Sequence, residues 1–499
     1  MAELSERIRA FIDERARSAG KTIAVTDVRP LAGGACQDNL QVELASADPD
    51  GETNRRVFVL RSDASRSLPG SLARRAEFAV IRAVVARGIR TPEVRWPGED
   101  LLGPGRSSYF MDWLPGETIA HRVLRAPELA DARAGLVAEA CAQLARIHTI
   151  TPESADEPAL IAALGDGRDD PIDTALALHR LALAELPEPH PAIELALRFL
   201  DDNRPRLGPR VLCHGDFRTG NLAVTPTGLS GVLDWEFAHW GDPMDDLGWV
   251  CVRDWRFGNL DRPGFGLVDR ASLYRAYEAA SGTAVDDAAV SYWELMGNVR
   301  WAIGALHQGE RYRTGAARDI ELIAVGKRAL EIEYELVRIL AAWERAAHRP
   351  AAAAEPGPGA PETTRPAGHA RAAASATYPG HADILRALAA FLRDDVRTAL
   401  DEDRRGLRYR ALVAAHMADQ LADELGGAEQ LAADEVDALQ RLLGRAGPLF
   451  ELRAEIARHI RADELDESRR AEIRAFLLST MGARLAVQSP RFCLARDIE

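Results

Sequence analysis

The sequence predicts an α+β protein made of a small β-rich part, a larger and mainly helical part, and a further all-α part. Segments with strand character are concentrated in residues 1–115, and apolar spacing typical of helices dominates residues 116–346. A stretch rich in Ala, Pro and Gly, residues 347–376, separates these from a final helical region, residues 377–499. A chain of 499 residues is too long for one ordinary core, so we expect several domains.

The β-rich part begins with an amphipathic helix pattern. The stretches TIAVTDVRPLAGG, NLQVELAS and RVFVLRSD then predict strands, with the turn-rich ADPDGETN between the last two. SLARRAEFAVIRAVVARG has helical spacing and ends at Gly88, a typical C-cap residue. SSYFMDWL predicts a return to strand.

The linker and the final region differ in composition. Arg349 to Ala376 contains no large apolar side chain and cannot bury a core, so we expect a mobile linker there. From Ala382 to Ala486 the spacing predicts three or more amphipathic helices. These helices are predicted to form a separate all-α accessory domain that a cut near Gly357 would release.

Charge excludes one broad class of function. The formal net charge is −14, which argues against a nucleic-acid-binding surface. Lysine occurs only at Lys21 and Lys327, so arginine must serve wherever a cation is needed.

Cysteine usage and hydropathy favour a cytoplasmic protein. The N-terminal stretch MAELSERIRAFIDERARSAG lacks the apolar core of a signal peptide, and no apolar run approaches the ~18–20 residues of a membrane span. Dispersed cysteines without a CxxC pair are typical of reduced, buried thiols. The five cysteines are Cys36, Cys141, Cys213, Cys251 and Cys493.

One polar cluster predicts chemistry. In RVLCHGDFRTGNLAV, a polar loop lies between two short apolar segments, and TPTG then predicts a hairpin turn before LSGVLDWE. The hairpin would bring Asn221 and Asp234 together, and two such oxygen ligands suit Mg²⁺. Asp216 could accept a proton from a hydroxyl that attacks a phosphorus, while His214 would hold the loop. The alternative is a polar loop with incidental carboxylates.

The ordered set resembles the catalytic loop of the aminoglycoside and choline kinase-like phosphotransferases, relatives of the protein kinases. The family pattern is His-Gly-Asp, an Asn five residues after the Asp, and an Asp about thirteen residues later, here Asp216, Asn221 and Asp234. The resemblance covers roughly residues 20–345. It implies a two-lobed protein-kinase-like fold, ATP and Mg²⁺ as cofactors, and a small-molecule hydroxyl as the phosphoryl acceptor.

The resemblance also implies a nucleotide site. LAGGACQDNLQVEL resembles the family's glycine loop, in which Gly33 and Gly34 would cover the ATP phosphates. Arg61 stands where the family has a Lys paired with a helix Glu, here Glu77, although Arg61 could instead be a surface residue at a strand end. YFMDWLPGETI resembles the hinge, where backbone groups of Met111 to Trp113 would meet adenine.

Several further residues are implied to support the loop. LARIHTI contains His148, which we interpret as structural. In GDPMDDLGW, Asp242 and Asp246 resemble the aspartates that brace the catalytic loop. A helix N-cap is the alternative role for Asp245 and Asp246.

Within the family, HGDFRTGN, LDWEFAHWGDP and CVRDWRFG resemble the branch found near, or fused to, acyl-CoA dehydrogenases. That branch implies a hydroxyacyl-CoA acceptor and makes an acyl-CoA dehydrogenase a candidate partner. The last ~120 residues resemble a helical domain of unknown function that accompanies such kinases.

Two stretches that pair Trp with Arg are predicted to flank the acceptor. They suit an anionic and partly apolar acceptor, whereas a polycationic aminoglycoside would need carboxylates. The alternative is that the aromatic residues are core and the arginines are solvated or paired with acids. The residues are Arg253, Trp255 and Arg256, then Arg300, Trp301 and Arg311.

Two other functions stay open at this stage. A catalytically weak or inactive kinase-like scaffold for nucleotide or acyl-CoA is favoured only by Arg61 in the Lys position. A choline- or aminoglycoside-type kinase differs from the favoured interpretation only in its acceptor.

Overall fold

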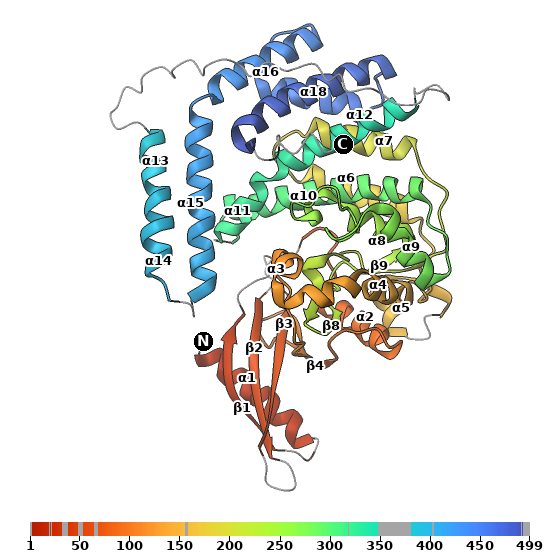
Figure 1. The fold of residues 1–499 in the computed structure, drawn as a ribbon, viewed down its shortest axis with the longest axis vertical. Coiled ribbons are helices and arrows are strands. Elements are labelled where there is room, and N and C mark those ends of the chain that lie inside the picture. The colour runs from red at the N-terminus through yellow and green to blue at the C-terminus, as the bar shows by residue number, and fades with distance from the viewer. Residues whose placement is uncertain are drawn as a thin grey trace. The chain divides into compact units, whose positions relative to one another are not determined.

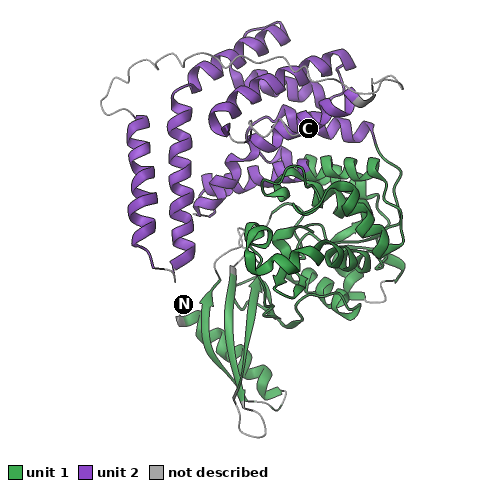
Figure 2. Ribbon diagram, in the orientation of Figure 1, with its two compact units in different colours: residues 1–181, 204–297 green, residues 182–203, 298–499 purple. Residues whose placement is uncertain are grey.

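The computed structural model describes most of the chain, and its ribbon is shown in Figure 1. The described residues are 2–18, 20, 22–31, 38–47, 53–63, 68–154, 158–317, 319–347, 381–401, 404–490 and 492. They form two compact units: unit 1 is residues 1–181 and 204–297, and unit 2 is residues 182–203 and 298–499 (Figure 2). Gly33, Gly34 and all but the first residue of the predicted linker lie outside the described residues.

Unit 1 begins with a five-stranded antiparallel sheet in the order β1-β2-β3-β5-β4. Helix α1 packs its Ile8 and Ile12 against Val42, Leu60 and Phe110 of the sheet. The elements of this lobe are α1 (Ala2–Ser18), β1 (Ile23–Pro30), β2 (Asp38–Ala47), β3 (Thr53–Ser62), α2 (Arg74–Ala86), β4 (Val94–Glu99) and β5 (Ser107–Asp112). The predicted small β-rich lobe is confirmed.

The alternation of side chains along β3 places Arg61. Leu60 enters the apolar core beside α1, and successive side chains of a strand point to opposite faces. Arg61 therefore points away from that core, to where Glu77 of α2 lies.

The rest of unit 1 is mainly helical. Its helices are α3 (Ala120–Arg125), η1 (Pro127–Leu129), α4 (Ala130–Ile147), η2 (Pro152–Ser154), α5 (Pro158–Leu164), most of α6 (Pro171–Ala184), α8 (Pro243–Cys251), η4 (Arg253–Arg256), α9 (Arg270–Ser281) and the start of α10 (Asp287–Arg313).

Two small sheets carry the polar motif within these helices. Strand β6 (Val211–Cys213) pairs with β9 (His239–Gly241). After η3 (Thr219–Asn221), strand β7 (Leu222–Thr225) pairs with β8 (Gly228–Val232). The hairpin predicted at TPTG is therefore present, and it places Leu222 opposite Val232.

Unit 2 is entirely helical in its described residues. It contains the end of α6, α7 (Pro191–Asp202), the rest of α10, α11 (Ile320–Lys327), α12 (Ala329–Ala347), α13 (His381–Ala390), the π-helical turn η5 (Phe391–Val396), α14 (Arg397–Ala399), α15 (Arg405–Leu425), α16 (Ala428–Leu443), α17 (Leu449–Arg461) and α18 (Glu467–Gln488). No described helix is long and apolar enough to span a membrane.

The boundary predicted between the helical lobe and the accessory domain needs correction. Within unit 2, α17 packs on α7 and α18 packs on α12. Arg461 pairs with the buried Glu194 of α7, and Arg470 lies 3.2 Å from Asp202. Helix α7 is buried at most of its positions, so it needs apolar cover on more than one side. Helices α17 and α18 provide part of that cover, so the described helices that follow residue 380 are not a separate body.

We therefore expect the two pieces to stay associated after cleavage of the linker. With a protease site inserted at Gly357, the nicked protein should elute as one species in size-exclusion chromatography and separate only in denaturant. The physical reason is that separation would expose apolar surface of α7 to water and break the ion pair between Glu194 and Arg461.

Arg461→Ala should promote separation, and the exposed Arg441→Ala serves as its control. Elution of two independent fragments from the unsubstituted protein would contradict this packing.

Candidate active site

The loop between β6 and η3 carries the predicted catalytic residues. Its backbone is fixed by Asp246 of α8, whose two oxygens accept hydrogen bonds from the N–H groups of His214 (2.7 Å) and Gly215 (2.9 Å). Gly215 has φ +76°, and a Cβ here would overlap the carbonyl oxygen of Phe237. Only glycine can therefore turn the chain toward Asp216.

Asp246 is held in turn by His148, which follows α4. Nε2 of His148 lies 3.2 Å from Asp246, and Nδ1 lies 2.7 Å from the hydroxyl of Tyr277. Burial alone would raise the pKa of Asp246, but its bonds to His148 and to the loop lower it to about 2. The carboxylate therefore stays ionised and holds both amides, as a bracing residue must.

His214 also binds backbone groups. Its Nδ1 accepts from the N–H of Asp216 (3.1 Å), so Nε2 carries the proton and donates to the carbonyl of Leu233 (3.0 Å). Burial lowers the pKa of His214 despite the nearby carboxylates, which favours the neutral ring. These contacts give His214 a positioning role.

Asp242 caps α8. Its carboxylate accepts from the N–H groups of Met244 (2.8 Å) and Gly208 (2.6 Å), and its backbone carbonyl accepts from Cys213 (3.3 Å). The side chains of His148, Cys213 and Asp246 also approach one another. Burial raises the pKa of Cys213, so it stays a thiol, and the group is a hydrogen-bonded support for the loop.

Asp216 is held by three donors. Trp249 Nε1 (2.8 Å) and Arg218 Nε (3.0 Å) donate to Oδ1, and Asn221 Nδ2 donates to Oδ2 (2.6 Å). An ionised carboxylate offers about four acceptor positions, so one on Oδ2 is left for a substrate hydroxyl. The carboxylate is thus held in one orientation, which suits a general base.

Sequence reasoning missed Trp249 and Arg218. Trp249 lies three residues after Asp246 on α8, and residues at that spacing share a helix face. Because Asp246 was already expected at the loop, this spacing could have identified Trp249. Arg218 stands two residues after Asp216 in HGDFRTGN. A positive charge so close to the predicted base could have identified it as a residue of the site.

Asn221 and Asp234 lie at neighbouring strand ends, as the hairpin predicts. The N–H of Leu233 donates to the carbonyl of Asn221 (2.8 Å). Asp234 has φ +70°, a conformation that costs a non-glycine residue of order 1–3 kcal/mol and is typical of functional sites.

The donors at these two positions fit Mg²⁺. The amide nitrogen of Asn221 is bound to Asp216, which turns its amide oxygen the other way. Burial alone would raise the pKa of Asp234, but Arg61 and then Arg218 lower it, and 32% of its side chain is exposed. An ionised carboxylate beside an amide oxygen is the hard donor set that Mg²⁺ prefers.

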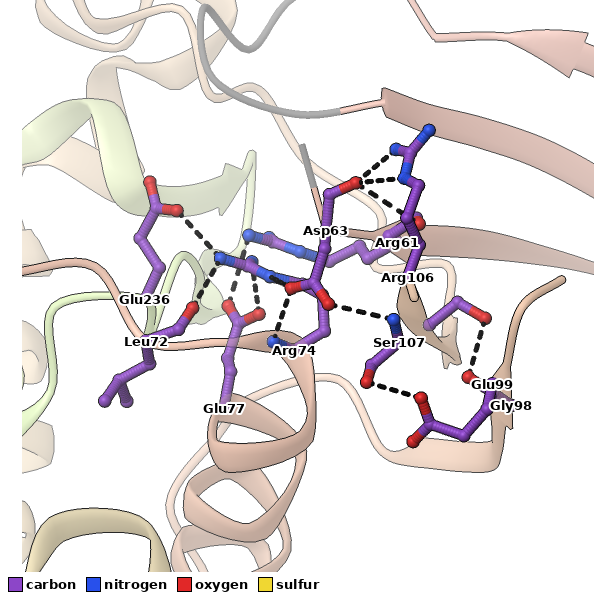
Figure 3. A network of polar contacts seen from close by, with 12 residues as sticks. Arg61, Asp63, Leu72, Arg74, Glu77, Gly98, Glu99, Arg106, Ser107 and Glu236 are labelled. Carbon is purple, nitrogen blue, oxygen red and sulfur yellow. Dashed lines mark hydrogen bonds and ion pairs between the residues drawn. The ribbon is translucent and has the colours of Figure 1, made fainter. Parts of the chain in front are cut away.

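Arg61 lies in a buried charge network (Figure 3). It contacts Glu77 (3.1 Å) and Asp234 (2.9 Å), so the predicted pairing with the helix glutamate is present and the alternative of a surface residue is wrong. Arg74 binds the other oxygen of Glu77 and lies 3.0 Å from Glu236. Two guanidinium groups therefore share three carboxylates.

Arg74 and Glu236 are further residues that sequence reasoning missed. Arg74 precedes Glu77 by three residues on the predicted helix, and Glu236 follows Asp234 by two, so both had positional signals. Burial and the Asp234 carboxylate raise the pKa of Glu236 to about 7, while Arg74 and Arg61 act in the opposite direction.

The predicted hinge requires one correction. Met111 pairs with Val59 of β3 and with Val94 of β4. The N–H of Trp113 donates to the carbonyl of Val57 (3.1 Å), so it is not available to adenine. If adenine binds at this hinge, it must therefore form hydrogen bonds with backbone groups other than the N–H of Trp113.

Arg256 does not have the role predicted for it. Nε and Nη2 donate to the carbonyl of Cys251 (3.1 and 3.0 Å), Nη1 donates to Leu260 (2.9 Å), and Nη2 also contacts Glu294 (3.0 Å). Because the protein itself occupies these donors, Arg256 fixes the loop that carries Trp255 and does not face a ligand.

Trp255 lies beside the catalytic loop. Its ring is 5.2 Å from that of Trp249, and the guanidinium of Arg218 lies 4.5 Å from its centroid. Trp255 is buried, as the core alternative requires, and it also contacts a residue that binds Asp216. Arg253 precedes it in η4 and is half-buried.

The other predicted acceptor residues follow the point at which α10 passes into unit 2. Arg300 and Trp301 are half-buried, and each has further contacts. Arg311 is buried and donates through Nη1 to Gln308 (2.8 Å), and its role at the acceptor stays a prediction.

The chain is similar to two curated proteins. It is 30% identical over 201 residues to acyl-CoA dehydrogenase family member 10 of Mus musculus, a match covering 40% of this chain and 18% of the mouse protein. It is 28% identical over 241 residues to homoserine kinase of Methylocella silvestris, covering 45% of this chain and 65% of that enzyme. The matches thus span less than two thirds of either relative.

Among solved structures, a Ralstonia eutropha protein described with the aminoglycoside phosphotransferases has a similar fold. The TM-score is 0.50 at 21% identity, over 69% of this chain and 98% of that chain. This similarity confirms the kinase-like fold.

Families match two parts of the chain. Residues 402–492 match a domain of unknown function (DUF6285), as expected for the final region. Residues 27–289 match the phosphotransferase enzyme family, whose members include kinases that phosphorylate small-molecule hydroxyl groups. Since this second match extends over more than half of the sequence, the chain belongs to the phosphotransferase enzyme family.

Proposed function

We propose that this protein is an ATP- and Mg²⁺-dependent kinase that phosphorylates a hydroxyl of an anionic small molecule, with a hydroxyacyl-CoA or a related hydroxy acid as the acceptor. The observation that carries the proposal is the Asp216 carboxylate, held by three donors with one acceptor position left on Oδ2.

The proposed chemistry uses Asp216 as the general base. An acceptor hydroxyl would donate its hydrogen bond to the remaining position on Oδ2, and Asp216 would take the proton as the oxygen attacks the γ-phosphorus. Trp249 and Asn221 prevent the carboxylate from rotating. Asp246 holds the backbone beneath it through His214 and Gly215.

The nucleotide side is built from the buried charge network. Asn221 and Asp234 would hold Mg²⁺, which supplies charge neutralisation for the phosphates when bound. Arg61 would contact phosphate oxygens in place of the family's Lys. Because Arg74 also binds Glu77 and contacts Glu236, these carboxylates do not depend on Arg61 alone. This division supports a working site over the inactive-scaffold alternative.

Two observations support the proposed acceptor class, and a third favours a second candidate. Arg218 and Trp249 bind Asp216, and Trp255 packs against both of them. A cation with aromatic rings suits an anionic, partly apolar molecule. The similarity to a mouse protein of the acyl-CoA dehydrogenase family favours an acyl-CoA. The similarity to a homoserine kinase favours a second candidate, a hydroxy amino acid.

The base assignment predicts the effect of Asp216→Asn. The amide keeps the size of the side chain but cannot take the proton, so turnover should fall about 10²–10⁴-fold. ATP affinity, measured by calorimetry, should change little. Turnover near that of the wild type would remove Asp216 from this role.

The metal assignment predicts a selective loss for Asp234→Ala. Wild-type protein should bind ATP more tightly with Mg²⁺ than without, and the variant should lose that difference because a ligand to the ion is gone. Asp234 also pairs with Arg61, so an equal change in both titrations would show that the carboxylate matters only as the partner of Arg61.

The acceptor assignment predicts an order of substrates. A hydroxyacyl-CoA should show kcat/KM at least about tenfold above its free hydroxy acid, since each charge-assisted contact contributes about 1.5–3 kcal/mol. Homoserine and kanamycin complete the panel. Preference for homoserine would select the second candidate, and comparable turnover of kanamycin would contradict an anionic acceptor.

A further inference from the structure

Arg218 differs from Arg74 and Arg256 in how its terminal nitrogens are used. Nε donates to Asp216 (3.0 Å), and the guanidinium stacks 4.5 Å from the Trp255 centroid. Among the described residues, neither terminal nitrogen of Arg218 has a hydrogen-bond or ion-pair partner. A guanidinium held at Nε and along its face therefore has two nitrogens to offer.

Two buried arginines provide the contrast. Arg256 uses Nε, Nη1 and Nη2 on protein acceptors, and Arg74 uses both terminal nitrogens on Glu77, Leu72 and Glu236. Both have side chains that are 11% exposed or less, while 24% of the Arg218 side chain is exposed. The protein thus binds both terminal nitrogens of Arg74 and of Arg256 and leaves those of Arg218 open.

The surroundings fix the open end of Arg218. Trp255 is buried and packs on Trp249, so the ring under the guanidinium cannot move away easily. A Cβ at Gly220 would overlap Nη1 of Arg218. The glycine two residues after the arginine therefore leaves the space that the fork occupies.

The location indicates the ligand. Nε of Arg218 binds Oδ1 of Asp216, the oxygen that does not carry the open acceptor position. An anion bound to the fork would thus lie beside the proposed base.

We propose that the terminal nitrogens of Arg218 form a phosphate-binding fork that specifies an oxyanion next to Asp216. A planar guanidinium matches two oxygens of one phosphate. The oxyanion is either the phosphoryl group in transfer or an anionic group of the acceptor. This inference rests on the proposed function. In the transfer itself the acceptor oxygen bonds to phosphorus, the bond from phosphorus to ADP breaks, and the proton goes to Asp216, while Arg218 only binds.

The test compares three variants. Arg218→Gln removes the charge, Arg218→Lys keeps the charge without the fork, and Gly220→Ala displaces the guanidinium without deleting it. Gly135→Ala is the control, because its Cβ would make only an ordinary contact at 3.7 Å. Unfolding temperatures are recorded for all four, and Gly220→Ala keeps the test available if the Arg218 variants fold poorly.

The two sources of the oxyanion give different kinetics. If the fork binds the phosphoryl group in transfer, kcat falls about 10- to 100-fold for charged and neutral acceptors alike. If it binds the acceptor's own anion, KM rises by a similar factor for the hydroxyacyl-CoA and a neutral alcohol is unaffected. Arg218→Lys and Gly220→Ala should follow Arg218→Gln in direction. Kinetics of all three within about twofold of wild type would overturn the inference while leaving the proposed function intact.

A binding measurement distinguishes failure of the proposed function from failure of the inference about Arg218. If wild-type protein transfers phosphate to no acceptor, the proposed function fails, and titration with inorganic phosphate then decides the inference. The wild type and Gly135→Ala should bind phosphate at least about tenfold more tightly than Arg218→Gln. Equal affinity would overturn the fork.

Discussion

The two backbone N–H groups of His214 and Gly215 donate to the two oxygens of one buried carboxylate, that of Asp246. Buried backbone donors must be satisfied, and a carboxylate satisfies them only while ionised. His148 and the loop amides keep the pKa of Asp246 at about 2 against the effect of burial. The position of Asp216 depends on this bond pair, and so do the contacts that Asn221, Arg218 and Trp249 make with its carboxylate.

The N-terminal lobe meets a different constraint, the burial of several charges in one place. A single arginine between Glu77, Asp234 and Glu236 would leave an excess of negative charge in a dry environment, which is costly. Arg74 supplies the second cation and binds two of the carboxylates. In a chain with only two lysines, replacing the family's Lys by Arg61 is accompanied by a second guanidinium in the same network.

The sequence predicted the elements and the loop because both have local signals. Strand alternation, the hairpin turn and the spacing of Asp216, Asn221 and Asp234 are properties of short segments, and the structure has them. Arg256 was misassigned because a cation beside a tryptophan looks the same in sequence whether its donors meet a ligand or a backbone carbonyl. Trp249 and Arg74 were missed because their partners, Asp216 and Glu236, lie far away in the chain, although helix spacing pointed to both.

The difference between local signals and contacts over long stretches of chain also explains the error about the C-terminal region. Composition locates a linker, but it does not report what the helices on either side bury. Residues 182–203 lie between two segments of unit 1 and nevertheless fold in unit 2, so the chain passes between the units three times. Helix α7 in this segment is buried at most positions and uses Glu194 to bind Arg461. A helix with so little exposed surface cannot be the edge of a domain, so the final helices complete a core that begins nearly three hundred residues earlier.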